Sequence, residues 1–353
     1  MEMTVIRRLL FPQNGKDTIT YETEMESIMV KQENGQNKLE NKPPLLVLTG
    51  PTAVGKTSLS IKLAKAVDGE IISADSMQVY RYMDIGTAKI TAEEMEGVPH
   101  HLIDILEPTD NFNVMLFQEK CKEAMQGIYE RGKIPILAGG TGFYIQSVLY
   151  DISFTETETD LAYREELQKI AEKEGAYVLH AKLAKIDPEA AEEIHPNNVK
   201  RVIRALEYYH QTGDLISEHN AMERRRESPY RFRYYVLSLP REELYSRINL
   251  RVDAMLEAGL TDEVKRLLDM GCRPDMVSMQ GLGYKEIIQA LEGDSTVDEA
   301  CERIKRETRH FAKRQFTWFR RERDVVWLEK ECFNNEDELL EYCLADLWQH
   351  GIV

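Results

Sequence analysis

The sequence predicts an α/β fold in which helices flank a parallel sheet, with a helical insertion domain and a helical C-terminal region. Three observations support this prediction. Continuous apolar runs end in glycine or in a carboxylate residue, as expected for strands buried on both faces of a sheet. Helical stretches separate these runs, a pattern typical of βαβ units. A long segment rich in Glu, Lys and Ala then interrupts the alternation.

The expected elements follow in chain order. Residues 1–42 mix charged and amide side chains with little periodicity, and we interpret them as a disordered N-terminal extension or the product of a start site placed too early. Strands are expected at 45–50, 70–75, 133–140, 232–240 and 325–329, and helices at 241–270, 283–292 and 297–322. The predicted domains are a core of 43–151 and 200–330, a helical insertion of 152–199 and a C-terminal helical tail of 331–353.

Composition limits the class of protein. The chain has 353 residues, 42% of them hydrophobic, so it can bury a sizeable core. It contains no run of 18 apolar residues and does not begin with a signal-peptide pattern. Its five cysteines are scattered, without a CxxC pair or zinc spacing, which fits a reducing compartment. We therefore expect a cytoplasmic protein without a membrane partner, and we expect a monomer.

The strongest motif is GPTAVGKT, which matches G-x-x-x-x-G-K-[ST] between a buried strand and a helix. Its glycines let backbone N–H groups curl around an anion, and the following helix N-terminus adds a favourable dipole. Lys56 supplies a positive charge and Thr57 a hydroxyl that can hold Mg²⁺. The motif predicts a P-loop NTPase-like sheet that binds a diphosphate or longer chain. The predicted diphosphate-binding residues are Gly50, Pro51, Thr52, Ala53, Val54, Gly55, Lys56 and Thr57.

Two further strand ends lie at the same predicted edge. Asp75 follows the second strand, and a carboxylate there points into the ligand crevice of such sheets. It is interpreted as a base or a Mg²⁺ ligand, with capping of the next turn as the structural alternative. Thr141 lies in a glycine-rich turn after the third strand, where it can donate a hydrogen bond to a ligand.

A basic segment stands out in a chain whose net charge is −16. The segment from Arg303 to Arg323 contains nine Lys and Arg residues but only two Glu, and four aromatic residues lie among them. Such a helix can follow phosphates while stacking on bases, although a solvated helix face is an equal alternative. The pair His100 and His101 is interpreted as structural, because no third metal ligand is suitably spaced.

At these motifs the sequence resembles the tRNA dimethylallyltransferases, also called tRNA isopentenyltransferases or the IPP transferase family, in the bacterial form. The resemblance covers residues 43–330 and does not include 1–42. Lys200 stands where Gln is expected, and no Cys/His finger follows the core. The matching blocks are GPTAVGKT, ISADSMQVYRYMDIGTAK, VPHHLID, IPILAGGTGFY, HPNNVKRVIRALE, REELYSRINLRVDAMLEAGL, QGLGYKE and TRHFAKRQFTWFR.

The resemblance implies transfer of a dimethylallyl group from dimethylallyl diphosphate to N6 of the adenosine 3′ of the anticodon, with release of diphosphate. Asp75 would be the general base, and Thr52 and Arg251 would assist around the transferring group. The tRNA anticodon stem-loop would be contacted by Asp75, Ser76, Met77, Gln78, Thr141, Arg164, Lys200, Arg201, Val202, Ile203, Arg204, Gln280, Gly281, Leu282, Gly283, Tyr284 and Lys285. From the basic segment we add Arg309, Lys313 and Arg314.

Three alternatives share the phosphate motif. A P-loop kinase for a small metabolite would explain Lys56, Asp75 and Mg²⁺ but would not explain the basic segment 303–323. A prenyltransferase acting on free adenine nucleotides would need no RNA-binding surface. A GTPase-like RNA-binding switch would require a guanine-specifying NKxD motif, which the sequence lacks.

Overall fold

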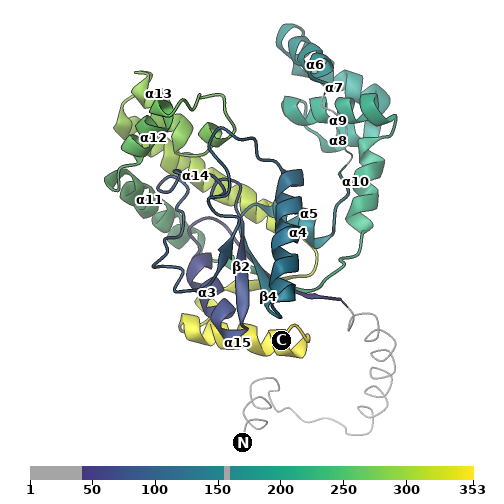
Figure 1. Ribbon diagram of the computed structural model, residues 1–353. Helices are drawn as coiled ribbons and strands as arrows, with labels where there is room; N and C mark the ends of the chain where they lie inside the picture. Colours follow the sequence, from purple (N-terminus) through teal and green to yellow (C-terminus); the bar gives the residue numbers. More distant parts are fainter. Residues whose placement is uncertain (1–41, 155–159) are drawn as a thin grey trace, which may run out of the picture. The chain divides into compact units, whose positions relative to one another are not determined.

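The computed structural model describes residues 42–154 and 160–353. Predictions for residues 1–41 therefore lie outside the described residues. Within the described part, six parallel strands form one sheet in the order β3-β2-β4-β1-β5-β6, and Figure 1 shows its helices around it. The strands are β1 (Pro44–Thr49), β2 (Gly69–Ala74), β3 (His100–His101), β4 (Ile134–Gly139), β5 (Arg231–Ser238) and β6 (Val325–Glu329).

The predicted α/β class with a parallel sheet is confirmed. Five strands lie in predicted segments, whereas the edge strand β3 was not predicted because two residues carry no periodic signal. Successive residues of β1 are fully buried on opposite faces: Leu45 and Val47 in one core cluster, Leu46 and Leu48 in the other. A strand covered on both faces needs apolar residues at every position, which explains the continuous apolar runs.

Two groups of helices cover the sheet. The cluster containing Leu45 includes residues of α4 (Val114–Glu130), α5 (Gly142–Leu149), α12 (Leu260–Asp269) and α13 (Tyr284–Leu291). The cluster containing Leu46 includes α3 (Lys56–Ala66) and α15 (Glu336–Gln349). Two longer helices, α11 (Arg241–Glu257) and α14 (Val297–Phe319), contribute side chains to both clusters.

The helical insertion extends past the boundary expected at residue 199. Its helices are α6 (Leu161–Lys173), α7 (Ala176–Ile186), α8 (Pro188–Glu193), α9 (Val199–Thr212) and α10 (Ile216–Arg225). Leu179, Leu183, Val202 and Leu206 are buried in one separate apolar cluster, which Ile216 of α10 also joins. The segment Lys200–Arg204 therefore belongs to the insertion, because its apolar face packs on α6 and α7 instead of the sheet.

The C-terminal helix α15 packs on the core, next to α3 (Figure 1). Asp346 accepts hydrogen bonds from Arg233 at 2.5 and 2.7 Å and from the Tyr235 hydroxyl at 2.6 Å, which fixes the helix to β5. At its other end Lys62 of α3 donates to Asp337 at 2.7 Å. Among the described residues, no helix is long and apolar enough to span a membrane.

Candidate active site

The loop between β1 and α3 has the backbone that its motif predicts. Gly50 and Gly55 adopt φ values of 146° and 96°, in the region that favours glycine. A Cβ atom on Gly50 would also lie 2.6 Å from the Leu237 carbonyl oxygen. The loop can therefore pass close to β5 and turn directly into α3, which presents the N-terminal amides of this helix at the strand edge.

Lys56, the first residue of α3, reaches back across this loop. Its Nζ donates to the carbonyl oxygens of Gly50 at 3.0 Å and Pro51 at 2.9 Å. Its pKa is lowered to about 8, mainly by burial and further by the Arg251 guanidinium, while Asp75 opposes the shift. The amine is thus influenced by both a second cation and a carboxylate, while Thr57 beside it is exposed.

Asp75 follows the last residue of β2 and serves as a cap. Its Oδ1 accepts from the backbone N–H groups of Met77 at 2.8 Å and Gln78 at 3.4 Å. For Oδ2 we find no hydrogen-bond partner among the described residues. The capping alternative is therefore realised by one oxygen, which leaves the other oxygen for chemistry.

The end of β4 lies beside Asp75. Ala74 and Gly139 are paired in register, and the Thr141 N–H donates to the Ala74 carbonyl at 3.2 Å. The Thr49 hydroxyl at the end of β1 donates to the Gly139 carbonyl at 2.7 Å. The structure thus brings the phosphate loop, Asp75 and Thr141 together at one sheet edge.

A set of cations surrounds the loop from distant parts of the chain. Nη1 of Arg251 lies 3.5 Å from the Thr52 hydroxyl oxygen. A Cβ atom on Gly55 would lie 3.0 Å from Nζ of Lys330 and 3.8 Å from Nη1 of Arg247. Sequence analysis missed Arg247 and Lys330: Arg247 lies one helical turn before Arg251, a signal that could have found it, whereas nothing marks Lys330.

Gln315 of α14 is a third residue that was not predicted from the sequence. Its side-chain oxygen accepts from the Thr52 N–H at 2.9 Å, and its amide nitrogen donates to the Gly140 carbonyl at 2.9 Å. The side chain is 6% exposed. A polar residue on the buried stripe of Ala312 and Phe319 was the available signal.

The segments 75–78 and 280–285 also meet, and Glu263, a fourth residue that was not predicted from the sequence, lies beside the second of them. The carboxylate of Glu263, 1% exposed, accepts from the N–H groups of Asp84, Ile85 and Gly86 and from the Tyr284 hydroxyl at 2.7 Å. A Cβ atom on Gly281 would lie 2.6 Å from the Met77 methyl group. Glu263 therefore ties the 84–86 turn to Tyr284, which lies in a segment that the resemblance assigns to tRNA.

The predicted tRNA-contacting residues divide by exposure. The side chains of Val202, Ile203 and Tyr284 are buried, as is Gly283, and they support the fold. Gln78 is committed to the carbonyls of Thr87 and Ala88, and Arg164 to the buried Glu207. The members with exposed side chains are Arg164, Lys200, Arg201, Arg204, Gln280, Lys313 and Arg314, and the half-buried ones are Asp75, Ser76, Met77, Gln78, Thr141, Gly281, Leu282, Lys285 and Arg309.

The basic segment of α14 also divides. Lys305 pairs with Asp253 at 2.7 Å, and Arg309 donates to Asn249 at 2.6 Å. In the described part of the chain, Lys313 and Arg314 have no ion pair. Three of the four aromatic side chains pack on other parts of the protein: Phe319 is fully buried, Phe316 stacks on Trp327, and Trp318 contacts Phe143.

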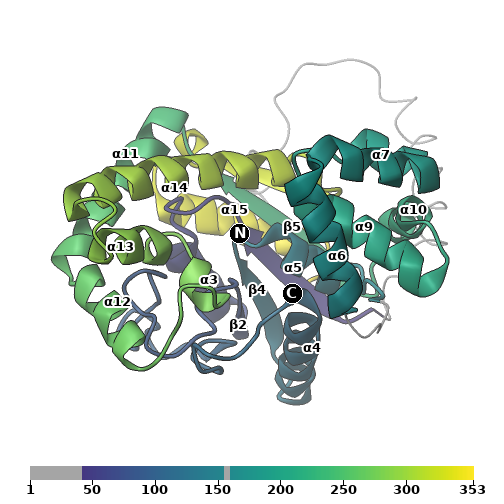
Figure 2. The ribbon, with the colours of Figure 1, turned by 90° about the horizontal axis from the view of Figure 1, so that it is seen from above.

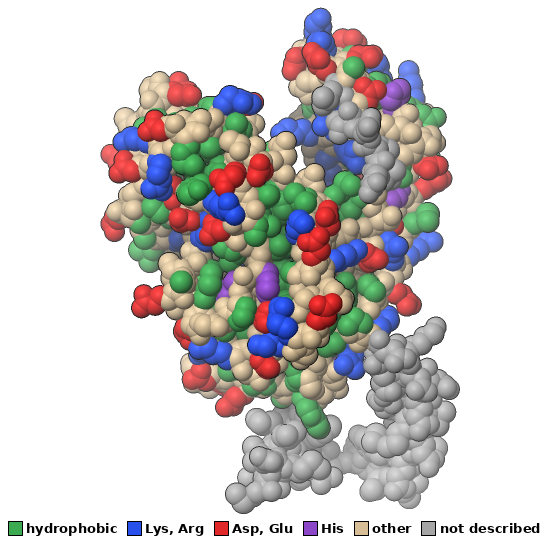
Figure 3. Space-filling view, in the orientation of Figure 1, with side chains coloured by type: hydrophobic (Ala, Val, Ile, Leu, Met, Phe, Trp, Pro, Cys, Tyr) green, Lys and Arg blue, Asp and Glu red, His purple; other side chains and the backbone are tan. Residues whose placement is uncertain are grey.

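Arg321, just after α14, and two cations of the insertion act on Glu193. Arg224 donates to this carboxylate at 2.7 Å and is the main cause of its lowered pKa, to which Arg201 and Arg321 also contribute. In Figure 2, α14 runs from α13 towards α6 of the insertion. Figure 3 shows basic and acidic side chains interspersed over the face drawn.

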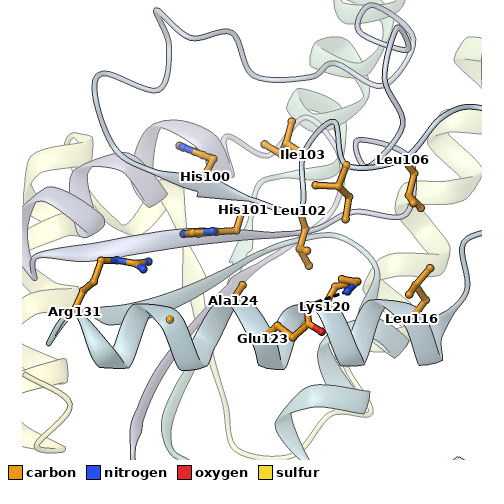
Figure 4. A pocket seen from close by; sticks show the side chains of 12 residues that line it. His100, His101, Leu102, Ile103, Leu106, Leu116, Lys120, Glu123, Ala124 and Arg131 are labelled. Atoms are coloured by element: carbon orange, nitrogen blue, oxygen red, sulfur yellow. Dashed lines mark hydrogen bonds and ion pairs between the residues drawn. The ribbon is translucent and has the colours of Figure 1, made fainter.

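A separate pocket lies between β3 and α4 (Figure 4), and no residue of the phosphate loop lines it. His101 lies at its wall and contacts the buried Glu70 at 2.8 Å. Arg131 donates to the same carboxylate and, with His101, lowers its pKa to about 2 against the opposing effect of burial. In this contact His101 serves a structural role, as the sequence indicated.

A parallel sheet with a glycine-bounded loop between β1 and α3, and with a carboxylate at the end of β2 on the other side of β4, defines a P-loop-like α/β enzyme. A family model described as IPP transferase matches residues 78–322, and one described as isopentenyl transferase matches residues 43–109. The chain belongs to the IPP transferase family, which confirms the resemblance.

Relatives are similar over most of their length. A tRNA dimethylallyltransferase of Lachnoclostridium phytofermentans is 58% identical over 88% of this chain and 99% of that protein. The solved structure of a Bacillus halodurans tRNA isopentenylpyrophosphate transferase is 46% identical, with a TM-score of 0.65 over 88% of this chain and 98% of that one. A eukaryotic dimethylallyltransferase acting on tRNA is 32% identical, with a TM-score of 0.67 over 81% of this chain and 74% of that one.

Proposed function

We propose that this protein transfers a dimethylallyl group from dimethylallyl diphosphate to N6 of the adenosine 3′ of the anticodon in tRNA, releasing diphosphate. The observation that carries the proposal is the single sheet edge at which Asp75 and Thr141 lie beside the loop of Lys56. A carboxylate base and a cation-lined phosphate site there serve the two reactants. The names of the relatives support tRNA prenylation over the kinase and free-nucleotide alternatives.

The residue types suit this chemistry. The adenine amine is a poor nucleophile because its lone pair is delocalised into the ring. Oδ2 of Asp75 accepts a proton from this amine as the new C–N bond forms. The allylic C–O bond breaks with its electron pair passing to diphosphate, whose charge is stabilised by the loop amides, Lys56 and Arg251.

Thr57 is the proposed Mg²⁺ ligand. In the described part of the chain, no group of three or more His, Cys, Asp or Glu side chains could hold a metal alone. An exposed hydroxyl beside a phosphate loop nevertheless fits Mg²⁺, which binds through few protein oxygens together with phosphate oxygens and waters. When bound, Mg²⁺ would neutralise charge on the diphosphate.

The anticodon stem-loop is the proposed macromolecular partner. The exposed cations Lys200, Arg201 and Arg204 of the insertion and Lys313 and Arg314 of α14 suit phosphate contacts. The target adenine must leave its stack to reach Asp75, at a cost of a few kcal/mol. The buried Val202, Ile203, Gly283 and Tyr284 are assigned to holding these surfaces in place.

We further propose a monomer in the cytoplasm. All five cysteines are free, which fits a reducing compartment.

A two-substrate assay tests the proposed function. Labelled dimethylallyl diphosphate is offered with unmodified tRNA or with AMP, and ATP is offered with small-molecule acceptors. We expect label to appear only in tRNA. Label in AMP would support the free-nucleotide enzyme, and phosphate transfer from ATP would support a kinase.

A further inference from the structure

The Gln315 side chain joins the two halves of the candidate active site. One half is the phosphate loop, through the Thr52 N–H, and the other is the turn after β4, through the Gly140 carbonyl. Both hydrogen bonds are 2.9 Å long, and the side chain is nearly inaccessible to solvent. The next residue, Thr141, lies beside Asp75 because its N–H is bonded to Ala74.

Only an amide of this length can make both contacts. A primary amide offers an acceptor and a donor on one planar group, whereas a carboxylate only accepts and a thioether does neither well. The fit is close: a Cβ atom on Gly140 would lie 2.4 Å from the Gln315 amide nitrogen. A Cβ atom on Gly142 would likewise lie 2.2 Å from the Trp318 ring, so α14 packs tightly against the whole turn.

The same helix carries proposed RNA contacts. Ala312, Gln315 and Phe319 form its buried stripe, while Lys313 and Arg314 are exposed. Anything that shifts α14 against the sheet therefore moves Gln315, and with it the distance between the phosphate loop and the turn that bears Thr141.

We propose that Gln315 is a positioning residue that sets the spacing between the diphosphate loop and the adenine-binding turn beside Asp75. The inference rests on the proposed function. In a transfer between two bound reactants the attacking nitrogen and the allylic carbon must be aligned, and misplacement by about 1 Å can cost about 10²-fold in rate. Gln315 would act on the rate of the chemical step and leave both binding surfaces in place.

The test is a single-turnover assay with full-length protein, saturating dimethylallyl diphosphate and saturating unmodified tRNA. Gln315→Met removes both hydrogen bonds at similar side-chain length, and Gln315→Glu keeps an acceptor for Thr52 but sets an oxygen against the Gly140 carbonyl. Thr317→Val is the matched control, since the Thr317 hydroxyl bonds only to the Lys313 carbonyl of the same helix. Thermal unfolding and tRNA binding are measured for each variant.

We expect the single-turnover rate of both Gln315 variants to fall by about 10²-fold, with the tRNA dissociation constant unchanged and Thr317→Val equal to wild type. If Gln315→Met does not fold, the single-turnover rate of Gln315→Asn is measured instead, because Asn keeps the same amide group on a side chain one methylene shorter. A folded variant at the wild-type rate under these saturating conditions would overturn the inference alone. Wild-type protein that transfers no label to tRNA would overturn the proposed function as well.

Discussion

Arg251 and Thr52 lie 199 residues apart in the chain, yet the Arg251 guanidinium reaches to 3.5 Å from the Thr52 hydroxyl. Helix α11 thereby brings a fixed positive charge to the phosphate loop, where Lys56 already supplies one. Without a bound anion, each cation disfavours the charged form of the other. Together with burial, the larger cause, this repulsion lowers the pKa of Lys56 to about 8. The pair is thus built to gain from binding a diphosphate.

Asp75→Asn separates the two roles of this carboxylate. Asn keeps an oxygen for the Met77 and Gln78 N–H groups but cannot accept a proton as a base. We expect turnover to fall by about 10²-fold or more, with tRNA affinity nearly unchanged. Asp75→Ala should be as slow and should also lack the turn cap. Wild-type turnover by Asp75→Asn, measured as label transferred to tRNA, would leave Asp75 with the capping role alone.

Lys56→Ala and Arg251→Ala should impair use of the prenyl donor. Both charges face the diphosphate end, so kcat/KM for dimethylallyl diphosphate should fall by about 10²–10³-fold while tRNA binding changes little. Lys62→Ala is the control, because Lys62 lies on the same helix as Lys56 but pairs with Asp337. An equal fall in tRNA affinity would contradict the assignment.

Use of the prenyl donor should also depend on pH through Lys56. Its pKa is lowered to about 8, so the amine is charged below this pH and loses its charge above it. We expect kcat/KM for the donor to decline as the pH rises through about 8. The Lys56→Arg variant stays charged over this range and should lack the decline. Its behaviour therefore distinguishes titration of Lys56 from titration of another group. The measurement is kcat/KM for dimethylallyl diphosphate from about pH 6.5 to about pH 9.5, a range that brackets the pKa of Lys56.

Neutralising Lys313 and Arg314 should weaken tRNA binding in a salt-dependent way. Each side chain that no longer neutralises a phosphate should flatten the slope of log affinity against log salt by about 0.7, or about 1.4 for the pair. Adding Arg309 to the set should contribute less, because Asn249 already holds it. Gln replacements at Lys120 and Lys265, on other helices, are the controls. An unchanged slope would show that this face of α14 is only a solvated surface. The helical insertion would then have to provide the RNA contacts.

Glu263→Ala should destabilise the fold strongly. It would leave the buried N–H groups of Asp84, Ile85 and Gly86 and the Tyr284 hydroxyl without their acceptor, so we expect the free energy of unfolding to fall by about 3–5 kcal/mol. The neighbouring Asp262→Ala, at an exposed position, should cost far less. Urea unfolding followed by circular dichroism measures both. Equal stability of the two variants would contradict the role of Glu263 in joining the 84–86 turn to Tyr284.

Local features of the sequence determined much of the outcome. The apolar run before Gly50, the P-loop motif and the helix after it lie within a few residues of one another, so spacing alone predicts their geometry. The parallel sheet follows from the same logic, because doubly buried strands are apolar at every position. The family blocks then placed Asp75, Thr141 and Arg251 in one site, and the structure brings them to one sheet edge.

Tertiary structure decided what depends on contacts between distant segments. Nothing near Gln315, Lys330 or Glu263 in the chain indicates that they meet the phosphate loop or the 84–86 turn. From the sequence, the aromatic residues of α14 are interpreted as groups that can stack on bases. In the structure, however, Phe319 is buried in the core and Phe316 stacks on Trp327. Periodicity reveals that a helix has a buried face, whereas the partner of that face is set by packing across the whole chain.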